Sequence, residues 1–510
     1  MRWHRDLAPA RTSRARLLEV MIIMTTAPAG RSRTLAADLP SAPSGRLVLI
    51  QGWVHRRRTL GAVTFLIVRD RSGLAQVVVR DPRGLQMARR CGEESVVAVT
   101  GAATPNPAAP GGVEVTEPVI TLLGEPAQPP PVDLWRPAID AGLPAILDHA
   151  AVTWRHPARR ARWELAAASL RGFRAALDEL GFTEIQTPKL VSSATESGAT
   201  VFGVDYFGRP AYLAQSPQFY KQTMVGVFER VYETGPVFRA EPHDTARHLA
   251  EYTSLDAELG FISDHRDVLA VLRQALAGMT AAVRDEAGGA VDLLKVTVPE
   301  VPAEIPVVHF REALIIAGAP PDEPDLAPAH ERAVGRWAAE THGSEFIAVE
   351  GYPMSKRPFY THPQPGDERW SNSFDLLFRG LELVTGGQRL NRHEDYVAAL
   401  TVRGLAPEDY VSYLEPFRHG MPPHGGFAIG LERWAGRLTQ AENIREVTLF
   451  PRDLHRLAPQ APAVRSKVDA EASGYLVGPP VFKTGERRAA ALAGSIPVRL
   501  RHCAPVRLAG

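Results

Sequence analysis

Residues 422–433 read Pro-Pro-His-Gly-Gly-Phe-Ala-Ile-Gly-Leu-Glu-Arg, which predicts a glycine-flanked strand running into a helix that begins near Glu432. Arg433 would then lie in the first turn of this helix. The helix dipole disfavours a cation at that position, whereas an arginine beside the free backbone N–H groups suits an anionic ligand. The stretch therefore predicts a strand–helix unit with an anion site at its junction.

A second informative stretch, Ser-Phe-Asp-Leu-Leu-Phe-Arg-Gly-Leu-Glu-Leu-Val-Thr-Gly-Gly-Gln-Arg, ends at Arg389. Asp375 and Glu382 are seven positions apart, and Thr385 follows them. Two carboxylates and a hydroxyl suit Mg²⁺, which prefers oxygen ligands and commonly shares them with substrate phosphates. Spaced acids alone more often mark a solvated surface. The Gly-Gly pair is expected to allow a tight bend that returns Arg389 to the same site.

A third stretch, Val-Phe-Arg-Ala-Glu, ends at Glu241. On a strand, Arg239 and Glu241 would point to one face. Arg239 could clamp a phosphate, and Glu241 could accept a hydrogen bond from an amino group such as that of adenine. The loop at 242–248 adds Arg247 and His248, which suit outer phosphates. An isolated Arg-x-Glu is more often a surface ion pair, but this loop favours a nucleotide site.

The pattern around these stretches predicts an α+β protein. Apolar residues recur every three or four positions over 159–180, which predicts a helix. Residues 230–241 and 252–261 alternate as strands do. Residues 46–125 read as short strands separated by turns, the pattern of a small β-barrel. Residues 46–80 carry seven arginines and one acid, Asp70, a local charge of +6.

Whole-chain composition limits the alternatives. The 510 residues carry 58 Lys and Arg against 57 Asp and Glu, so no global basic field indicates a nucleic-acid partner. Two cysteines make no disulfide framework, and no stretch reaches the roughly 20 apolar residues of a membrane span. We therefore expect a cytoplasmic protein with no membrane partner. The expected segments are a disordered N-terminal extension at 1–45, the barrel at 46–125, a proline-rich hinge at 126–155, a catalytic domain at 156–459 and an extension of unknown role at 460–510.

The three stretches together resemble motifs 2 and 3 of the class II aminoacyl-tRNA synthetases, with the acidic block between them. Residues 159–188 resemble motif 1, the dimer-interface motif. The pattern is most similar to aspartyl-tRNA synthetases of the compact archaeal and eukaryotic type, including their bacterial relatives. The resemblance covers about 46–459 and implies an OB-fold anticodon-binding barrel, an antiparallel catalytic sheet flanked by helices, and a homodimer.

The resemblance also implies roles for individual residues. Arg239 and Arg433 would be catalytic. The set that resembles the ATP site is Arg239, Glu241, Arg247, His248, Leu249, Glu382, Gly430, Leu431, Glu432 and Arg433. The set associated with Mg²⁺ is Asp375, Glu382 and Thr385, the last in place of the usual serine. The set around L-aspartate is Glu196, Gln218, Lys221, Arg239, Asp256, Thr385 and Arg389.

Charge favours aspartate as the amino acid. A buried substrate carboxylate needs paired positive charge, which Lys221 and Arg389 would supply. The related asparaginyl enzymes lack the Gln218-x-x-Lys221 pattern. A neutral amide would leave the lysine unpaired, and such a mismatch discriminates strongly.

The resemblance extends to the anticodon. Phe65 and Gln76 are eleven positions apart, like the family's stacking aromatic and its reader of the central uridine, and Glu114 resembles a further contact. OB-folds read splayed bases by stacking and edge hydrogen bonds. His55 and Pro107 resemble the relaxed members that charge both tRNA(Asp) and tRNA(Asn).

The implied reaction is the ATP-dependent attachment of L-aspartate to tRNA(Asp), and to tRNA(Asn) as well, through aspartyl-adenylate. Three alternatives stay open: an enzyme specific for tRNA(Asp), a paralogue that activates an amino acid outside translation, and a catalytically dead tRNA-binding protein. The ammonia-using asparagine synthetases resemble such a paralogue but lack the barrel. Retention of Arg239, Glu382, Arg389 and Arg433 argues against the dead protein.

Overall fold

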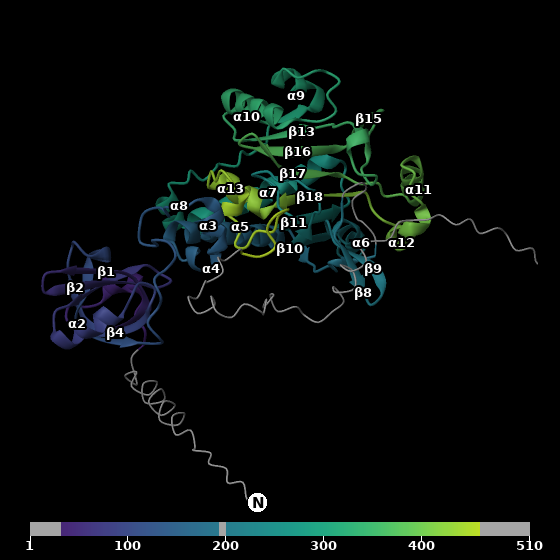
Figure 1. Cartoon of the computed structure of the whole chain (residues 1–510). Coiled ribbons are helices and arrows are strands. Elements are labelled where there is room, and N and C mark those ends of the chain that lie inside the picture. The colour runs from purple at the N-terminus through teal and green to yellow at the C-terminus, as the bar shows by residue number, and fades with distance from the viewer. Residues whose placement is uncertain (1–31, 193–199, 460–510) are drawn as a thin grey trace, which may run out of the picture. The chain divides into compact units, whose positions relative to one another are not determined.

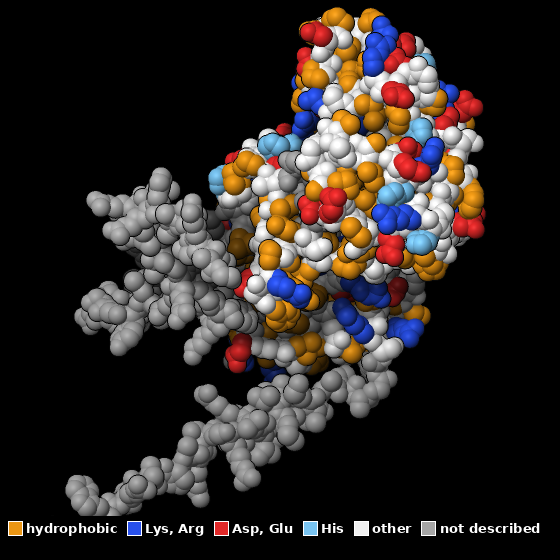
Figure 2. All heavy atoms as spheres, turned by 90° about the vertical axis from the view of Figure 1, so that its right-hand side faces the viewer, with side chains coloured by type: hydrophobic (Ala, Val, Ile, Leu, Met, Phe, Trp, Pro, Cys, Tyr) orange, Lys and Arg blue, Asp and Glu red, His pale blue; other side chains and the backbone are white. Residues whose placement is uncertain are grey.

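The computed structural model describes residues 32–192 and 200–459, and Figure 1 shows how their helices and strands are arranged. Residues 1–31, 193–199 and 460–510 lie outside the described residues, and with them the C-terminal extension, most of the N-terminal one and Glu196. Within the described ranges, no helix combines the length and the apolar character that crossing a membrane requires. On the face drawn in Figure 2, Lys and Arg side chains are interspersed with acidic and hydrophobic ones.

The N-terminal part is a closed five-stranded barrel with the strand order β1-β2-β3-β5-β4. Its alternating valines and other apolar residues point inward, so Val54, Leu66, Val77, Val97 and Val115 form a core from which solvent is excluded. The strands are β1 (Leu47–Leu60), β2 (Val63–Arg69), β3 (Leu74–Val79), β4 (Val96–Pro105) and β5 (Val113–Leu122), with helix α2 (Pro82–Arg90) between β3 and β4.

A turn at Asp70, between β2 and β3, anchors part of the N-terminal extension. The Asp70 carboxylate accepts from the backbone N–H groups of Ser72 and Gly73 at 2.7 and 3.1 Å. It also accepts from the backbone N–H of Ala36 at 2.8 Å. Ala36 belongs to the 3-10 helix η1 (Ala36–Ser41), which packs on the barrel core. The described end of the extension is therefore ordered against the barrel.

The part that follows the barrel is built on an eight-stranded sheet with the order β12-β13-β16-β17-β18-β11-β10-β6. The pairs β12–β13 and β10–β6, at the two edges, are parallel and the others are antiparallel. The expected antiparallel sheet is thus mixed. The strands are β6 (Thr183–Glu184), β10 (Arg230–Phe238), β11 (Glu251–Gly260), β12 (Val307–His309), β13 (Phe346–Glu350), β16 (Ser373–Phe378), β17 (Leu381–Gln388) and β18 (His424–Gly430).

Three helices pack on this sheet to form the largest core. Helix α5 (Pro157–Glu179), expected at 159–180, crosses α7 (His265–Glu286) at a pair of glycines, and α13 (Leu431–Leu438) contributes Trp434. A Cβ atom on Gly172 would lie 2.3 Å from the Gly278 carbonyl oxygen, so only glycine permits this approach. Rigid packing of these helices fixes the strand ends that carry the site.

The remaining elements surround the sheet. Two smaller cores form on it, one under α9 and α10 and one between α6, α11 and α12. The elements are α3 (Leu143–Asp148), α4 (Ala150–Thr153), β7 (Leu190–Val191), β8 (Gly203–Tyr206), β9 (Arg209–Leu213), α6 (Gln218–Phe228), α8 (Gly288–Leu294), α9 (Phe310–Ala317), α10 (Pro328–His342), β14 (Pro363–Gln364), β15 (Asp367–Ser371), α11 (His393–Val402) and α12 (Val411–Arg418).

Candidate active site

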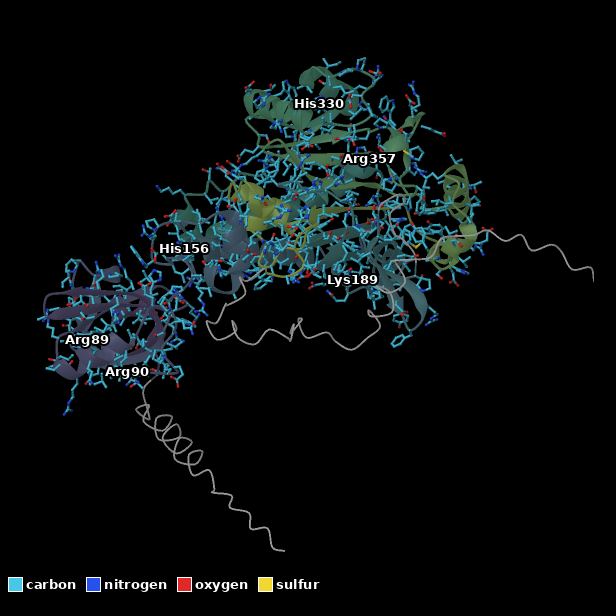
Figure 3. The ribbon with its side chains drawn as sticks, in the orientation of Figure 1. Arg89, Arg90, His156, Lys189, His330 and Arg357 are labelled. Carbon is cyan, nitrogen blue, oxygen red and sulfur yellow. The ribbon has the colours of Figure 1, made fainter. Side chains whose placement is uncertain are left out.

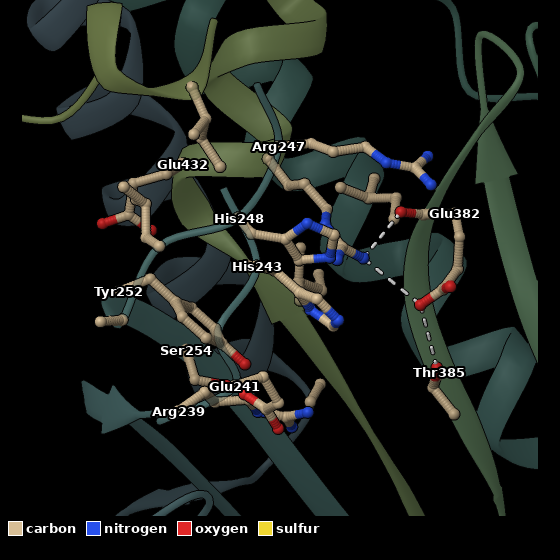
Figure 4. A pocket seen from close by; sticks show the side chains of 18 of the residues that line it. Arg239, Glu241, His243, Arg247, His248, Tyr252, Ser254, Glu382, Thr385 and Glu432 are labelled. Atoms are coloured by element: carbon tan, nitrogen blue, oxygen red, sulfur yellow. Dashed lines mark hydrogen bonds and ion pairs between the residues drawn. The ribbon is translucent and has the colours of Figure 1, made fainter. Parts of the chain in front are cut away.

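A cavity of about 300 Å³ opens where β10, β11, β17 and β18 meet the start of α13. Nine of the ten residues expected to hold ATP line it, together with Thr385. The exception is Leu431, which is 2% exposed and packs in the core beneath. Figure 4 shows Arg239 and Glu241 at one end and Glu382 and Thr385 on the facing wall.

Arg239 and Glu241 reach the cavity by a different route from the one expected. Strand β10 ends at Phe238, so both residues follow the strand instead of lying on it. The Arg239 N–H still donates to the Ala250 carbonyl at 2.8 Å, which holds the chain beside β11. Both side chains thus line one cavity, although they do not lie on a strand, where alternate side chains would share a face.

The loop after Glu241 supplies two imidazoles. His248 Nδ1 lies 2.6 Å from the Thr245 hydroxyl, and the His248 ring centroid is 4.8 Å from that of His243, a residue that sequence reasoning missed, with the two rings tilted by 45°. Burial, followed by the charge of Arg433, lowers the pKa of His248 below its usual value. His248 is therefore a neutral hydrogen-bonding group at neutral pH, while Arg247 carries the positive charge of this loop.

Arg433 spans the cavity from the first turn of α13 to β17. Its Nη1 donates to the Glu382 carbonyl at 3.1 Å and lies 3.3 Å from a carboxylate oxygen of the same residue. The Thr385 hydroxyl lies 3.5 Å from that carboxylate oxygen. The Glu382 backbone N–H donates to buried Glu331 of α10 at 2.9 Å. Glu331, which had no local sequence signal, thereby fixes the strand that presents Glu382.

Asp375 does not face the cavity as its spacing had suggested. Its two carboxylate oxygens lie 3.1 and 3.0 Å from the guanidinium of Arg357, which is labelled in Figure 3 and stacks 4.0 Å from the Tyr352 ring. Burial raises the pKa of Asp375 to about 6 against the opposing effect of Arg357. Among the described residues, no group of three or more His, Cys, Asp or Glu side chains could hold a metal ion. Asp375 is thus a buried partner of Arg357 and lies beside Thr385, its neighbour across the strand pair.

Glu432 lines the cavity, but its carboxylate is turned toward β11. Both of its oxygens accept from the Thr253 N–H, at 3.1 and 3.0 Å. Burial raises the pKa of Glu432 to about 7. This carboxylate therefore connects the start of α13 to β11. Gly430, Glu432 and Arg433 line the cavity from this junction.

Four buried charges lie behind the cavity, on α6, on β11 and directly after β17. Lys221 Nζ is 2.9 Å from an Asp256 oxygen and 3.2 Å from a Glu258 oxygen, and Arg389 Nε is 3.0 Å from the other Glu258 oxygen. All four side chains are less than 10% exposed. The two expected cations therefore already have carboxylate partners, and the cluster has no formal net charge.

Glu258 was not identified from the sequence, although one signal was present. Ser254, Asp256 and Glu258 alternate along β11 and so share one face of the sheet. The Ser254 hydroxyl donates to Asp256 at 2.5 Å. Gln218, expected near the amino acid, is buried, and its Nε2 has no hydrogen-bond partner within residues 32–192 and 200–459. A buried amide left in this state suits a ligand that would complete its hydrogen bonds.

Glycines let the strands approach these charges. A Cβ atom on Gly426 would lie 2.0 Å from a Glu258 carboxylate oxygen, and one on Gly387 would lie 2.6 Å from the Ser373 Cβ. Gly386 and Gly387 lie within β17, which continues straight to Gln388. The expectation of a bend at this pair was wrong, because the glycines provide close strand contact and Arg389 follows the end of the strand.

Comparison with known proteins identifies this arrangement. A family model described as tRNA synthetases class II (D, K and N) matches residues 144–454, and one described as OB-fold nucleic acid binding domain matches 48–123. The chain is 46% identical over 431 residues to the Thermus thermophilus protein named Aspartate--tRNA(Asp/Asn) ligase, covering 84% of this chain and 100% of that protein. A Deinococcus radiodurans protein of the same name is 43% identical over 436 residues, covering 84% and 99%. The chain belongs to the class II tRNA synthetases.

Solved structures share the fold of this synthetase. Asparaginyl-tRNA synthetase from Pyrococcus horikoshii, complexed with asparaginyl-adenylate, matches with a TM-score of 0.78 at 28% identity, covering 84% of this chain and 100% of that one. Aspartyl tRNA synthetase from Entamoeba histolytica matches with a TM-score of 0.76 at 27% identity, covering 85% and 94%. Because enzymes for both amino acids share the fold, side chains must decide the specificity.

The barrel of this synthetase places three expected anticodon residues on one outer face. Cross-strand partners share a face, and Phe65 lies two residues from Ile67, the partner of Gln76. Gln76 Nε2 donates to Glu114 at 3.0 Å across β3 and β5, and Asn106 donates to the same carboxylate oxygen at 2.7 Å. The synthetase thus has an aromatic ring and a preformed polar pair beside each other.

His55 and Pro107 differ from each other in exposure. Pro107 is exposed in the turn after β4. His55 is the extra residue of a β-bulge in β1, and its Nδ1 lies 3.1 Å from Arg69, the buried partner of Glu94. Burial, followed by Arg69, lowers the pKa of His55 to about 4. His55 is therefore a neutral internal group, and its expected contact with a base is not available in this arrangement.

Proposed function

We propose that this synthetase activates L-aspartate with ATP and transfers it to tRNA(Asp) and to tRNA(Asn). The observation that carries the proposal is the buried cluster of Lys221, Asp256, Glu258 and Arg389 beside the cavity that nine of the ten expected ATP residues line. Both curated relatives described above are named for the same amino acid and the same two tRNAs.

In the first step, the aspartate α-carboxylate attacks the ATP α-phosphate and pyrophosphate leaves, which gives aspartyl-adenylate, so no protein nucleophile is needed. Arg239 would bind the α-phosphate, where negative charge develops, and Glu241 would accept from the adenine amino group. Arg433 would pair with phosphate oxygens from the opposite wall, with Arg247 and His248 reaching the outer phosphates. The rate would come from positioning and from charges fixed in advance.

Two groups in the cavity fit a magnesium ion. Glu382 and Thr385 present a carboxylate and a hydroxyl on the same wall, and Mg²⁺ commonly takes few protein ligands and fills its other positions with phosphate and water. When bound, the ion would neutralise the phosphate charge. Asp375 is committed to Arg357 and would support Thr385 from the neighbouring strand.

The charge cluster suits aspartate because it offers both signs at fixed places. Asp256 would accept from the substrate ammonium, while Arg389 and Lys221 would attract the side-chain carboxylate. Gln218 would donate its free amide hydrogens. Asparagine would offer Lys221 and Arg389 a neutral amide in place of a carboxylate, and a polar mismatch of this kind in a buried site discriminates strongly.

In the second step, the aspartyl group passes to the terminal ribose hydroxyl of the tRNA and AMP leaves, so the tRNA must be held at its acceptor end and at its anticodon. We propose that Phe65 stacks on an anticodon base and that Gln76, held by Glu114, reads an edge of its neighbour. Exposed Pro107 would face the third base, and the chain would accept either tRNA there. A homodimer formed through α5 and β6 and a cytoplasmic location complete the proposal, since residues 159–188 resemble motif 1.

Exchange of labelled pyrophosphate into ATP by the full-length protein tests the first step. We expect exchange that depends on L-aspartate and is at least a hundredfold weaker with L-asparagine. If none of the amino acids supports exchange, the protein is a catalytically dead module. If aspartate supports exchange but neither tRNA is charged, the protein is a paralogue that acts outside translation.

A further inference from the structure

Four buried polar side chains form a hydrogen-bonded group behind the charge cluster. They are Gln222, Tyr396, Tyr413 and His424, and none is more than 6% exposed. Gln222 is at the centre: its Nε2 lies 2.9 Å from both the Tyr396 hydroxyl and His424 Nε2, and its Oε1 lies 2.8 Å from the Tyr413 hydroxyl. None of these side chains lines the nucleotide cavity.

Two backbone carbonyls beside this group, those of Pro422 and Leu390, determine which atom donates the hydrogen in each of its hydrogen bonds. His424 Nδ1 lies 2.9 Å from the Pro422 carbonyl, which can only accept, so Nδ1 carries the hydrogen. His424 Nε2 is then a lone pair that accepts from the Gln222 amide. The Tyr396 hydroxyl donates to the Leu390 carbonyl at 2.6 Å and so accepts from the same amide. The Gln222 oxygen is left to accept from Tyr413.

This pattern permits only one orientation of the Gln222 side chain. Exchanging its oxygen and nitrogen would place the oxygen against the lone pair of His424 and against Tyr396, whose hydrogen is committed to Leu390. In low dielectric, such a fully satisfied network is rigid, and each broken bond leaves a buried partner unpaired.

The group joins three segments that present the cations of the amino-acid site. Gln222 follows Lys221 in α6, and Leu390 follows Arg389 after β17. The His424 carbonyl accepts from the Arg389 N–H at 2.9 Å, and His424 lies two residues before Gly426, whose carbonyl accepts from the Arg389 guanidinium at 2.9 Å.

We propose that Gln222 is a positioning residue for aspartate, which fixes the separation of Lys221 and Arg389 through Tyr396, Tyr413 and His424. The inference rests on the proposed function, since it assigns these residues to the aspartate side of that site. It places specificity for the substrate side chain partly in residues that do not touch the substrate. The nucleotide half of the site, built on β10 and α13, is not joined by this group.

Kinetics of single-group variants test this role in the full-length enzyme. Tyr413→Phe removes one hydroxyl, and Gln222→Met removes the amide while keeping the length of the side chain. Thr223→Ala is the matched control, because the Thr223 hydroxyl bonds only within α6, to the Phe219 carbonyl. Active-site titration would correct each rate for folded enzyme, and pyrophosphate exchange would give KM for aspartate and for ATP separately.

We expect KM for aspartate to rise about tenfold in Tyr413→Phe and more in Gln222→Met, because an unpaired buried group shifts its neighbours. KM for ATP should stay within about twofold, as should both constants in Thr223→Ala. If a variant does not fold, Tyr396→Phe provides another removal of one hydroxyl from the same group.

A merely structural role would lower the melting temperature and the active fraction and leave KM for aspartate unchanged, and that result would overturn the inference. An equal rise in both KM values would overturn it too. A wild-type enzyme without aspartate-dependent exchange would instead refute the proposed function, and this inference with it.

Discussion

Replacing Lys221 by methionine removes the only lysine of the buried charge cluster and keeps most of the side-chain volume. Lys221 Nζ lies 2.9 Å from Asp256, 3.2 Å from Glu258 and 3.3 Å from the Phe427 carbonyl. Without it, two buried carboxylates share Arg389, and the cluster changes from neutral to a formal charge of −1.

Two effects of different size should follow. Breaking a buried ion pair by removing one partner costs about 3–5 kcal/mol of folding stability. For the substrate, a cation about 4 Å from a carboxylate contributes about 4 kcal/mol at an effective dielectric constant of 20. Since 1.4 kcal/mol is a factor of ten, we expect kcat/KM for aspartate to fall by about 10³.

Urea denaturation and pyrophosphate exchange measure the two effects. The matched control is Lys189→Met, which removes a partly buried lysine 2.7 Å from Glu233 that does not line the cavity. Lys189→Met should lose stability with kcat/KM for aspartate changed by less than about threefold. If Lys221→Met activates aspartate normally, the assignment of the charge cluster to the substrate carboxylate is wrong.

Three further predictions address other parts of the structure. Gly426→Ala would place a Cβ atom 2.0 Å from Glu258, so we expect aspartate-dependent exchange to fall by at least about a hundredfold, whereas Gly203→Ala, with open space around it, should leave exchange unchanged. Gln76→Ala should raise KM for both tRNAs by about tenfold and leave pyrophosphate exchange unchanged; a change in exchange would contradict a role confined to the anticodon. Glu350→Gln should lose up to about 3 kcal/mol of stability at pH 7. Burial opposes ionisation of Glu350, but hydrogen bonds from His265 and Arg266 outweigh it and lower its pKa to about 2 from 4.5. The stabilisation is therefore complete above pH 4.5 and is lost as pH falls through 2, so equilibrium unfolding curves of the variant and the wild type should converge there. A difference that stays constant with pH would refute this origin.

Local patterns in the sequence were enough to predict several of the helices and strands. Apolar periodicity placed α5 within two residues at each end, and alternation placed β11 within one residue at each end but extended β10 three residues too far. The strand–helix junction before Arg433 was also predicted, because glycines and the helix start are local signals. The residues expected at the ATP site came from the family resemblance of three short stretches, and nine of the ten line one cavity.

Tertiary contacts decided what the sequence could not predict. Arg357 reaches Asp375 and Glu331 reaches the Glu382 backbone from elements that carry no motif. Gly386 and Gly387 suggested a bend, but their role depends on the neighbouring strand β16. His55 was expected at the anticodon from the resemblance alone, and a one-residue bulge that the sequence does not signal turns it toward Arg69.

Charging of purified tRNA(Asp) and tRNA(Asn) with labelled L-aspartate tests the central proposal most directly. The proposal is that one site activates aspartate and that the barrel accepts either tRNA. We expect the wild-type enzyme to charge both with kcat/KM values within about threefold of each other. A hundredfold preference for tRNA(Asp) would contradict the relaxed recognition, and no charging of either tRNA would contradict the function itself.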